Sequence, residues 1–319
     1  MAGRSPRIGL LVAMLAALGA SIAPTAQAAG QGATNLCAQP PTPGGREITL
    51  TSSGVQRTAL LHLPPAAAGE RLPLLVGLHG AGAGFFERYS GFSVLADAEG
   101  FAALYPNPID EADGRTFWNI NDHQPHGPDD VQFISDLLNY VESSVCVNTS
   151  RVYAAGVSNG GGMAASAVCA LSDRFAAFAS IAGGYESLPR CQPTNPVSVL
   201  EIHGTEDGSV PYNGSRSTGA GAVRPWVAAW RLRDQCHGAP AVSRISPRVE
   251  RYEWSNRAEG TAVEHIKIFG GNHQLPGGLP PDRGQASTIS ASWWAWSFLR
   301  QHRQAGPYTV AAARARRAG

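Results

Sequence analysis

A serine flanked by glycines is the residue of this sequence best placed to act as a nucleophile. Residues 156–160 read Gly-Val-Ser-Asn-Gly, after a β-branched and aromatic run at 151–155 and before a small-residue run that begins near Gly161. This pattern predicts a sharp strand-to-helix turn with Ser158 at its apex, where glycines remove Cβ atoms that would clash. The backbone N–H of Asn159 and the start of the helix would then face an oxyanion beside Ser158. For the pentapeptide alone, an ordinary loop is the alternative interpretation.

Two downstream loops supply partners in the chain order serine, acid, histidine. The apolar run 197–202 predicts a buried strand, which ends in a polar turn that carries Glu206 and Asp207. We predict Asp207 as the acid, with Glu206 as the alternative. The alternating run 263–269 predicts a strand that opens into a glycine-rich loop with His273. A histidine held in such a loop lies over the sheet edge, so His273 is predicted as the general base.

Most of the nine histidines are expected to do other work. His203 is predicted to cap a strand end, and His265 to be packed or solvated within an alternating strand. His123 and His126 fall in a long Pro/Gly-rich loop, where they could line a cleft, and His62 lies in an early strand.

A second oxyanion donor is expected from the loop after an early strand. The apolar run 74–78 ends in His79 and Gly80, followed by further glycines. Small residues let backbone N–H groups approach a carbonyl oxygen closely. We therefore predict an oxyanion hole formed by the backbone N–H groups of Asn159, His79 and Gly80. An ordinary glycine-rich turn is the alternative for this segment taken alone.

These motifs resemble a known group of proteins, the secreted esterases that include feruloyl esterases, acetylxylan esterases and polyhydroxybutyrate-depolymerase-like lipases. The resemblance runs from about Cys37 to about Phe298 and is sharpest at 129–161, where an Asp-Asp-Val-x-Phe helix leads into the nucleophile strand. The family's Gly-Thr-x-Asp and Gly-x-x-His turns match 204–207 and 270–273. The resemblance implies an α/β-hydrolase fold and the triad Ser158, Asp207 and His273. Family members often have Trp-Pro after the histidine, whereas this chain has Gln-Leu-Pro at 274–276.

The resemblance also implies two disulfides, Cys37–Cys146 and Cys169–Cys191. Five cysteines allow at most two intrachain bridges, and the residues alone leave the connectivity open. Cys236 then remains as a free or intermolecularly paired thiol. The sequence contains no Cys-x-x-Cys pair or close His/Cys set, so we predict no metal site and no cofactor.

The first 29 residues have the pattern of a secretory signal peptide. Arg4 and Arg7 precede an apolar run at 8–22, and Ala-Gln-Ala follows at 26–28. No later segment is apolar for long enough to span a bilayer. We therefore expect a secreted protein, extracellular or periplasmic, with no membrane contact after signal removal. A formal net charge of +1 gives no reason to expect a nucleic-acid partner; the oligomeric state is not indicated.

Alternating strand and helix patterns predict an α/β fold with a mostly parallel central sheet and helices on both faces. The runs 47–50 and 56–63 suggest a β-hairpin, 102–106 a strand, and 131–145 and 289–304 helices. We predict a single catalytic domain at 30–304, followed by a flexible Ala/Arg-rich tail at 305–319.

The function predicted from these features is serine-dependent hydrolysis of carboxylic esters. Expected substrates are feruloyl or acetyl esters of plant polysaccharide, or polyhydroxyalkanoate-type polyesters. The alternatives are a polymer amide hydrolase of the poly(aspartate) type, for which the same triad would serve, and a non-catalytic binding protein on a hydrolase scaffold. Aromatic and polar loop residues suit a substrate pocket, with Trp118 equally able to pack its loop against the body; the predicted set is Phe85, Trp118, Asn119 and Trp254.

Overall fold

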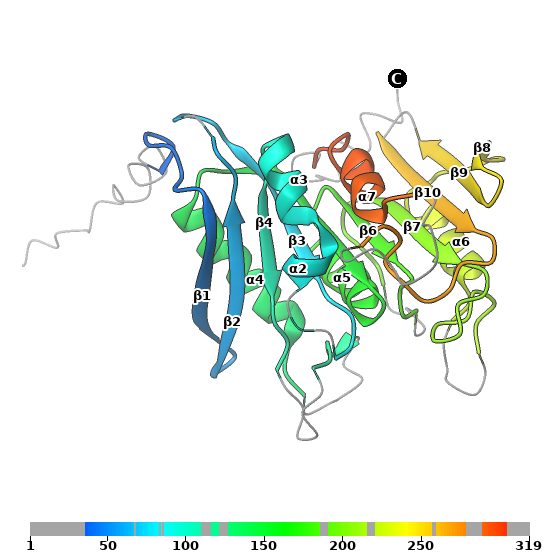
Figure 1. The fold of residues 1–319 in the computed structure, drawn as a ribbon, viewed down its shortest axis with the longest axis horizontal. Helices are drawn as coiled ribbons and strands as arrows, with labels where there is room; N and C mark the ends of the chain where they lie inside the picture. The colour runs from blue at the N-terminus through cyan, green and yellow to red at the C-terminus, as the bar shows by residue number, and fades with distance from the viewer. Residues whose placement is uncertain are drawn as a thin grey trace, which may run out of the picture.

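A ten-stranded mixed sheet organises the chain (Figure 1). The computed structural model describes residues 36–66, 68–82, 84, 86–109, 116–120, 127–185, 191–215, 221–256, 260–278 and 289–304. Within these residues the strand order is β1-β2-β4-β3-β5-β6-β7-β10-β9-β8. The strands are β1 (Gly44–Ser52), β2 (Val55–Leu63), β3 (Leu72–Leu78), β4 (Ala102–Pro106), β5 (Val147–Val157), β6 (Ala177–Ile181), β7 (Ser198–Gly204), β8 (Ala241–Ser246), β9 (Val249–Asn256) and β10 (Thr261–Ile268).

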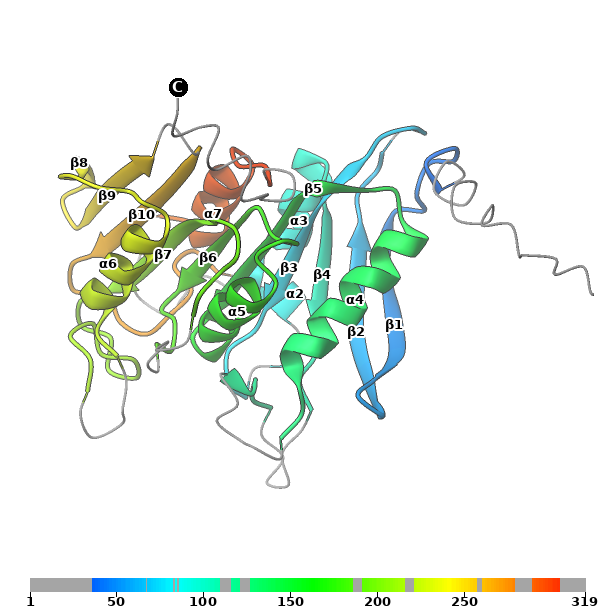
Figure 2. The same cartoon turned by 180° about the vertical axis from the view of Figure 1, so that it is seen from behind.

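Six neighbouring strands at the centre, from β4 to β10, run parallel, and antiparallel strands close both edges of the sheet. Figure 1 shows α2, α3 and α7 in front of the sheet, and Figure 2 shows α4, α5 and α6 on the opposite face. The helices are α2 (Phe86–Ser90), α3 (Phe92–Glu99), α4 (Asp130–Ser144), α5 (Asn159–Ala170), α6 (Val223–Arg233) and α7 (Ala291–Leu299). The layout confirms the predicted α/β class and places the carboxyl ends of the central strands along one edge, where α/β proteins bind ligands.

Two apolar cores hold these layers together, one on each face of the sheet. The first packs α4, α5 and α6 against the sheet, with Phe133, Met163 and Trp230 fully buried. The second packs α2, α3 and α7, where the rings of Phe101 and Trp296 stack with centroids 3.8 Å apart. A sheet covered on both faces needs strands that are apolar on both sides, and every residue of β3 is buried.

Most predicted elements lie where the sequence indicated. The N-terminal hairpin turns through Ser53 and Gly54, both with positive φ (49° and 80°), a conformation that suits a two-residue hairpin loop. The expected helix at 289–304 is shorter in the structure. It begins after Ser290, whose hydroxyl accepts a hydrogen bond from the Trp293 N–H, and ends at Leu299.

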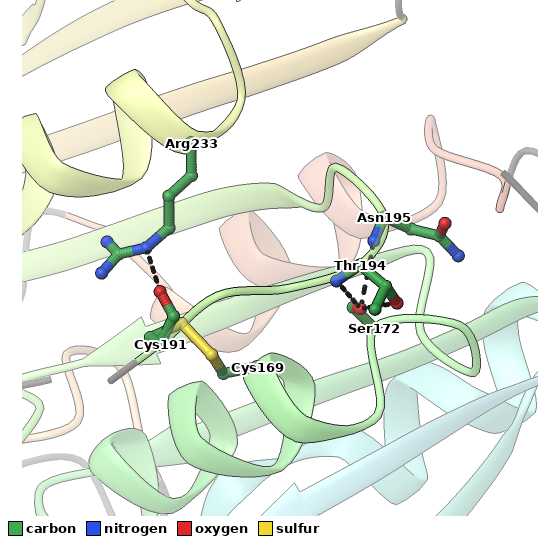
Figure 3. The surroundings of a disulfide bond; sticks show 6 residues. All are labelled: Cys169, Ser172, Cys191, Thr194, Asn195 and Arg233. Atoms are coloured by element: carbon green, nitrogen blue, oxygen red, sulfur yellow. Dashed lines mark hydrogen bonds between the residues drawn. A yellow bond between two sulfur atoms is a disulfide. The ribbon is translucent and has the colours of Figure 1, made fainter. Parts of the chain in front are cut away.

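Two disulfides are present, Cys37–Cys146 and Cys169–Cys191, the pairs that the resemblance implies. The second ties the last turn of α5 to the segment that leads into β7 (Figure 3). Arg233 of α6 donates to the Cys191 carbonyl oxygen at 2.9 Å. The disulfide and this hydrogen bond together connect α5, α6 and the segment before β7. Cys236 is a free thiol with 1% exposure, and such burial disfavours the intermolecular pairing that the sequence left open.

Several predicted segments lie outside the described residues: the signal peptide at 1–29, the tail at 305–319, and the residues Phe85, His123 and His126. Among the helices that the structure describes, none combines the length and the apolar character that crossing a membrane requires.

Candidate active site

The turn between β5 and α5 holds Ser158 in a strained conformation. Its φ of 57° and ψ of −123° lie outside the regions that non-glycine residues usually occupy. A Cβ on Gly156 would lie 2.1 Å from the Gly160 carbonyl oxygen, and one on Gly160 would lie 2.2 Å from the carbonyl oxygen of Leu78. Both glycines are therefore needed for the close packing of β5, α5 and β3, and α5 starts directly after Ser158.

Ser158, His273 and Asp207 are hydrogen-bonded in series. The Oγ of Ser158 lies 2.9 Å from Nε2 of His273, and Nδ1 of His273 lies 2.8 Å from Oδ2 of Asp207. The three residues come from the carboxyl ends of β5, β7 and β10, which meet at one edge of the sheet. A hydroxyl, an imidazole and a carboxylate in this order can activate the hydroxyl as a nucleophile.

Asp207, and not its neighbour Glu206, faces the histidine. Its Oδ1 accepts from the backbone N–H groups of Ser209 and Val210, at 2.9 and 2.7 Å. Burial acts to raise the pKa of Asp207, but hydrogen bonds from His203, His273 and Val210 outweigh it and hold the pKa well below its usual range. Glu206 is exposed.

The His79–Gly80 peptide lies beside the serine. A Cβ on Gly80 would be 3.2 Å from the Ser158 Cβ, so the backbone passes as close as a side chain would allow. The His79 carbonyl oxygen accepts a hydrogen bond from Nε1 of Trp118 at 2.9 Å. Because the carbonyl and the N–H of a trans peptide point in opposite directions, this bond fixes the direction of the Gly80 N–H.

Trp118 and Asn119 are integrated into the body of the protein. Trp118 is 3% exposed, and its backbone N–H and carbonyl both bond the side-chain amide of Asn159, at 2.7 and 3.2 Å. The Asn119 N–H donates to Asp130, and its side chain donates to the Pro128 carbonyl. In the structure both residues therefore anchor the loop that carries them, and Trp118 supports the peptide beside Ser158.

Trp254 lies elsewhere, on β9. It lines a groove of about 780 Å³ between α6 and the β9–β10 edge, together with Tyr252, His265 and Lys267. The described lining of this groove contains none of the three residues bonded in series.

Three features near the site were not predicted from the sequence. Tyr89 of α2 lies near Gly80, and burial raises the pKa of its phenol to about 12. In the sequence, Tyr89 lies in an Arg-Tyr-Ser run shortly after two phenylalanines, and this pattern does not single it out. Glu201 and His203 lie behind Asp207, where His203 Nε2 is 3.2 Å from the Asp207 Oδ2. No local pattern in the sequence pointed to that contact.

Comparison with known proteins also indicates an esterase. Residues 58–187 match the family model described as "Esterase PHB depolymerase". The Nocardia uniformis subsp. tsuyamanensis protein named "Putative esterase NocK" is 31% identical over 268 residues, which cover 75% of each chain. Feruloyl esterase B of Piromyces equi is 30% identical over 237 residues, 68% of this chain and 42% of that protein.

Among solved structures, the acetyl xylan esterase from Aspergillus awamori superposes with a TM-score of 0.55 at 16% identity, covering 75% of this chain and 96% of that one. At this identity the match supports the fold alone. Sequence and fold together show that this chain belongs to the esterase PHB depolymerase family, with an α/β-hydrolase fold, and that it is a carboxylic ester hydrolase.

Proposed function

We propose that the chain cleaves esters through an acyl-enzyme on Ser158. The observation that carries the proposal is the unbroken series of hydrogen bonds from Ser158 through His273 to Asp207. As Oγ attacks the acyl carbon, Nε2 of His273 takes its proton, and Asp207 stabilises the imidazolium that forms. The imidazolium returns the proton to the departing alcohol. Water, activated by the same imidazole, then releases the acid.

The oxyanion of the tetrahedral intermediate is assigned to backbone N–H groups. Asn159 is the first residue of α5, so its N–H precedes the intrahelical hydrogen-bond ladder and is free to face a ligand. The His79–Gly80 segment supplies the second donor, and the packing of Gly80 against Ser158 supports this role. Donors fixed before the reaction stabilise the developing charge without reorganising.

The substrates proposed are feruloyl or acetyl esters carried by plant polysaccharide. The resemblance to feruloyl esterase B supports this class. Hydroxyalkanoate polyesters are the second class, supported by the family match. Amide polymers such as poly(aspartate) would use the same three side chains.

Export of the protein is also proposed. Removal of residues 1–29 would leave one catalytic domain at 30–304 followed by the tail. The two disulfides support this location, because such bonds persist in oxidising compartments.

The mechanism is tested by Ser158→Ala, with Ser143→Ala on the exposed end of α4 as the matched control. We expect Ser158→Ala to lose esterase turnover and covalent labelling by a fluorophosphonate, and Ser143→Ala to retain both. Wild-type turnover or labelling of purified Ser158→Ala would refute the assignment of the nucleophile.

The substrate class is tested by measuring kcat/KM side by side on methyl ferulate, acetylated xylan, polyhydroxybutyrate and poly(aspartate). The proposal expects methyl ferulate or acetylated xylan to be the preferred substrate. A preference for polyhydroxybutyrate would assign the second class, and hydrolysis of poly(aspartate) alone would overturn the ester proposal for polymers.

A further inference from the structure

A buried set of ionisable side chains backs the Asp207 carboxylate, and the proposed mechanism uses none of them. Glu201 and His203 lie on β7, and His265 lies on the neighbouring strand β10. Glu201 is fully buried, His203 is 1% exposed and His265 is 5% exposed. Buried charges are retained only where other groups compensate for lost solvation, so the contacts of this set need an explanation.

Among the described residues, both ring nitrogens of His203 face hydrogen-bond acceptors. Nδ1 lies 2.9 Å from Oε1 of Glu201. Nε2 lies 2.9 Å from the Val210 carbonyl oxygen and 3.2 Å from Oδ2 of Asp207. A carbonyl oxygen and ionised carboxylates accept hydrogen bonds and do not donate them, so both ring nitrogens must carry protons. His203 is therefore an imidazolium placed between two carboxylates.

The electrostatics agree with this proton count. Burial alone would lower the pKa of His203, but its hydrogen bonds to Asp207 and Glu201 outweigh burial and raise it to about 10. Burial would also raise the pKa of Glu201, yet the charge of His265 and the hydrogen bond from His203 lower it to about 2.

Two tyrosines and a lysine also lie next to this set. The hydroxyl of Tyr185 donates to Oε1 of Glu201 at 2.9 Å. Nδ1 of His265 is in ion-pair contact with Oε2 of Glu201, although the contact is not aligned as a hydrogen bond. Tyr212 bonds the outer nitrogen of His265 at 2.8 Å, and Lys267 of β10 is in register with His203.

We propose that His203 is a positioning residue, which Glu201 holds in place so that its imidazolium keeps the Asp207 carboxylate turned toward His273. The proposal rests on the triad assigned above. His203 and His273 both contact Oδ2 of Asp207, while Oδ1 accepts hydrogen bonds from the backbone of the turn at 207–210. His203 also bonds the Val210 carbonyl oxygen and so ties the end of this turn to β7. Its positive charge offsets part of the negative charge that the Asp207 carboxylate presents to His273.

Two substitutions distinguish the contact between His203 and Asp207 from the positive charge of His203. His203→Asn retains a donor near the Nδ1 position for Glu201 and loses the contact with Asp207. His203→Gln retains a neutral donor near the Nε2 position. We expect His203→Asn to lower kcat about 10- to 100-fold, the size of effect known for residues that orient the ligands of a metal site, with KM little changed. His203→Gln should recover part of kcat. In both variants the acid limb of the pH–rate profile should move to higher pH, because Asp207 then faces His273 with its charge uncompensated.

The matched control is His302→Asn. His302 is half-buried and bonds the Ser198 hydroxyl at 3.0 Å at the amino end of β7. His302→Asn should leave kcat and the acid limb of the pH–rate profile unchanged. A general packing effect would instead lower kcat in both His203→Asn and His302→Asn and would move the acid limb in neither. A second measurement needs no variant: ¹⁵N NMR of the histidine-labelled wild type at pH 8.5 should show a doubly protonated imidazole.

Wild-type kcat and an unmoved acid limb in folded His203→Asn would overturn the inference, and so would the absence of a doubly protonated imidazole at pH 8.5. If Ser158→Ala is inactive in the same series, the triad stands and only the role of His203 fails. If Ser158→Ala retains activity, the proposed function itself fails.

Discussion

Two buried carboxyl groups lie along β7, one in the middle of the strand and one beside its amino end, and the two groups behave in opposite ways. At the middle of β7, Glu201 is surrounded by Tyr185, His203 and His265. At the amino end, Asp234, which follows α6, accepts a hydrogen bond from the Val197 N–H at 3.0 Å. Both carboxyl groups are almost completely buried, with 0% and 1% exposure.

The difference in their surroundings decides their charge. Burial raises the pKa of Asp234 to about 8, because one backbone hydrogen bond and the charge of Arg233 do not offset the lost solvation. The guanidinium of Arg233 instead lies over the Trp230 ring and donates to Cys191. Glu201 overcomes the same loss through its imidazole neighbours, and its pKa falls to about 2. Burial alone thus favours a neutral acid, and of these two places along β7 the one around Glu201 has the donors that keep a carboxylate ionised.

The largest effect expected from this comparison is on turnover. Asp207→Asn should lower kcat by about 10⁴-fold, because a neutral amide leaves the imidazole in the wrong tautomer, as in the serine-protease precedent. Asp234→Asn, the same change at the other end of β7, should leave kcat unchanged. Steady-state kinetics on one ester substrate measures both. A loss of less than tenfold in Asp207→Asn would remove Asp207 from the triad and reopen the case for Glu206.

The next effect is on the free energy of unfolding. Glu201→Gln removes the negative charge from a site where His203 and His265 are buried, and breaking a buried ion pair from one side costs about 3–5 kcal/mol. Urea denaturation of the variant and the wild type at pH 7 measures the loss. A loss below about 1 kcal/mol would mean that Glu201 is not paired with a charged His203 in the folded protein.

Local patterns were enough to predict much of this fold and the three side chains bonded in series. Apolar runs bounded by glycine or proline located β3, β4 and β7, and the chain order of the motifs selected Ser158 and His273. The β8–β9 hairpin was missed because every residue of β8 but the last is exposed, so no alternation marks a buried face.

The charged set behind Asp207 could not be predicted in this way. His203 looked like a strand cap and His265 like a packed or solvated residue, because Glu201 and His265 lie 64 positions apart and become neighbours only when β7 pairs with β10. The loop residues show the same limit. Trp118 was a candidate for substrate binding, but its contacts with His79 and Asn159 depend on distant segments that no local pattern reveals.

A smaller effect is expected in the pH dependence of stability. The pKa of Asp234 is raised in the folded protein, so its contribution is fully present below the unfolded pKa near 4 and is lost as the pH rises through about 8. Between pH 6 and pH 8 the wild type should lose about 2 kcal/mol more than Asp234→Asn, which has no carboxyl group to ionise there. Denaturation of both proteins at the two pH values gives the difference. Equal losses would show that Asp234 is ionised in the fold, as Glu201 is.

The smallest effect concerns an exposed carboxylate. Asp129 resembles Asp234 in having one backbone donor, since its Oδ1 accepts from the Gln132 N–H at 2.8 Å, but it caps α4 in contact with water. Water therefore solvates the Asp129 side chain, whereas Asp234 is shielded from it. The Asp129 side chain stabilises the helix as an ordinary N-cap. Asp129→Ala should cost about 1 kcal/mol of unfolding free energy, and Asp129→Asn only a few tenths, because the amide oxygen still accepts the bond. Urea denaturation compares the pair. If Asp129→Asn costs as much as Asp129→Ala, the negative charge at the start of α4 matters more to the helix than the accepted hydrogen bond.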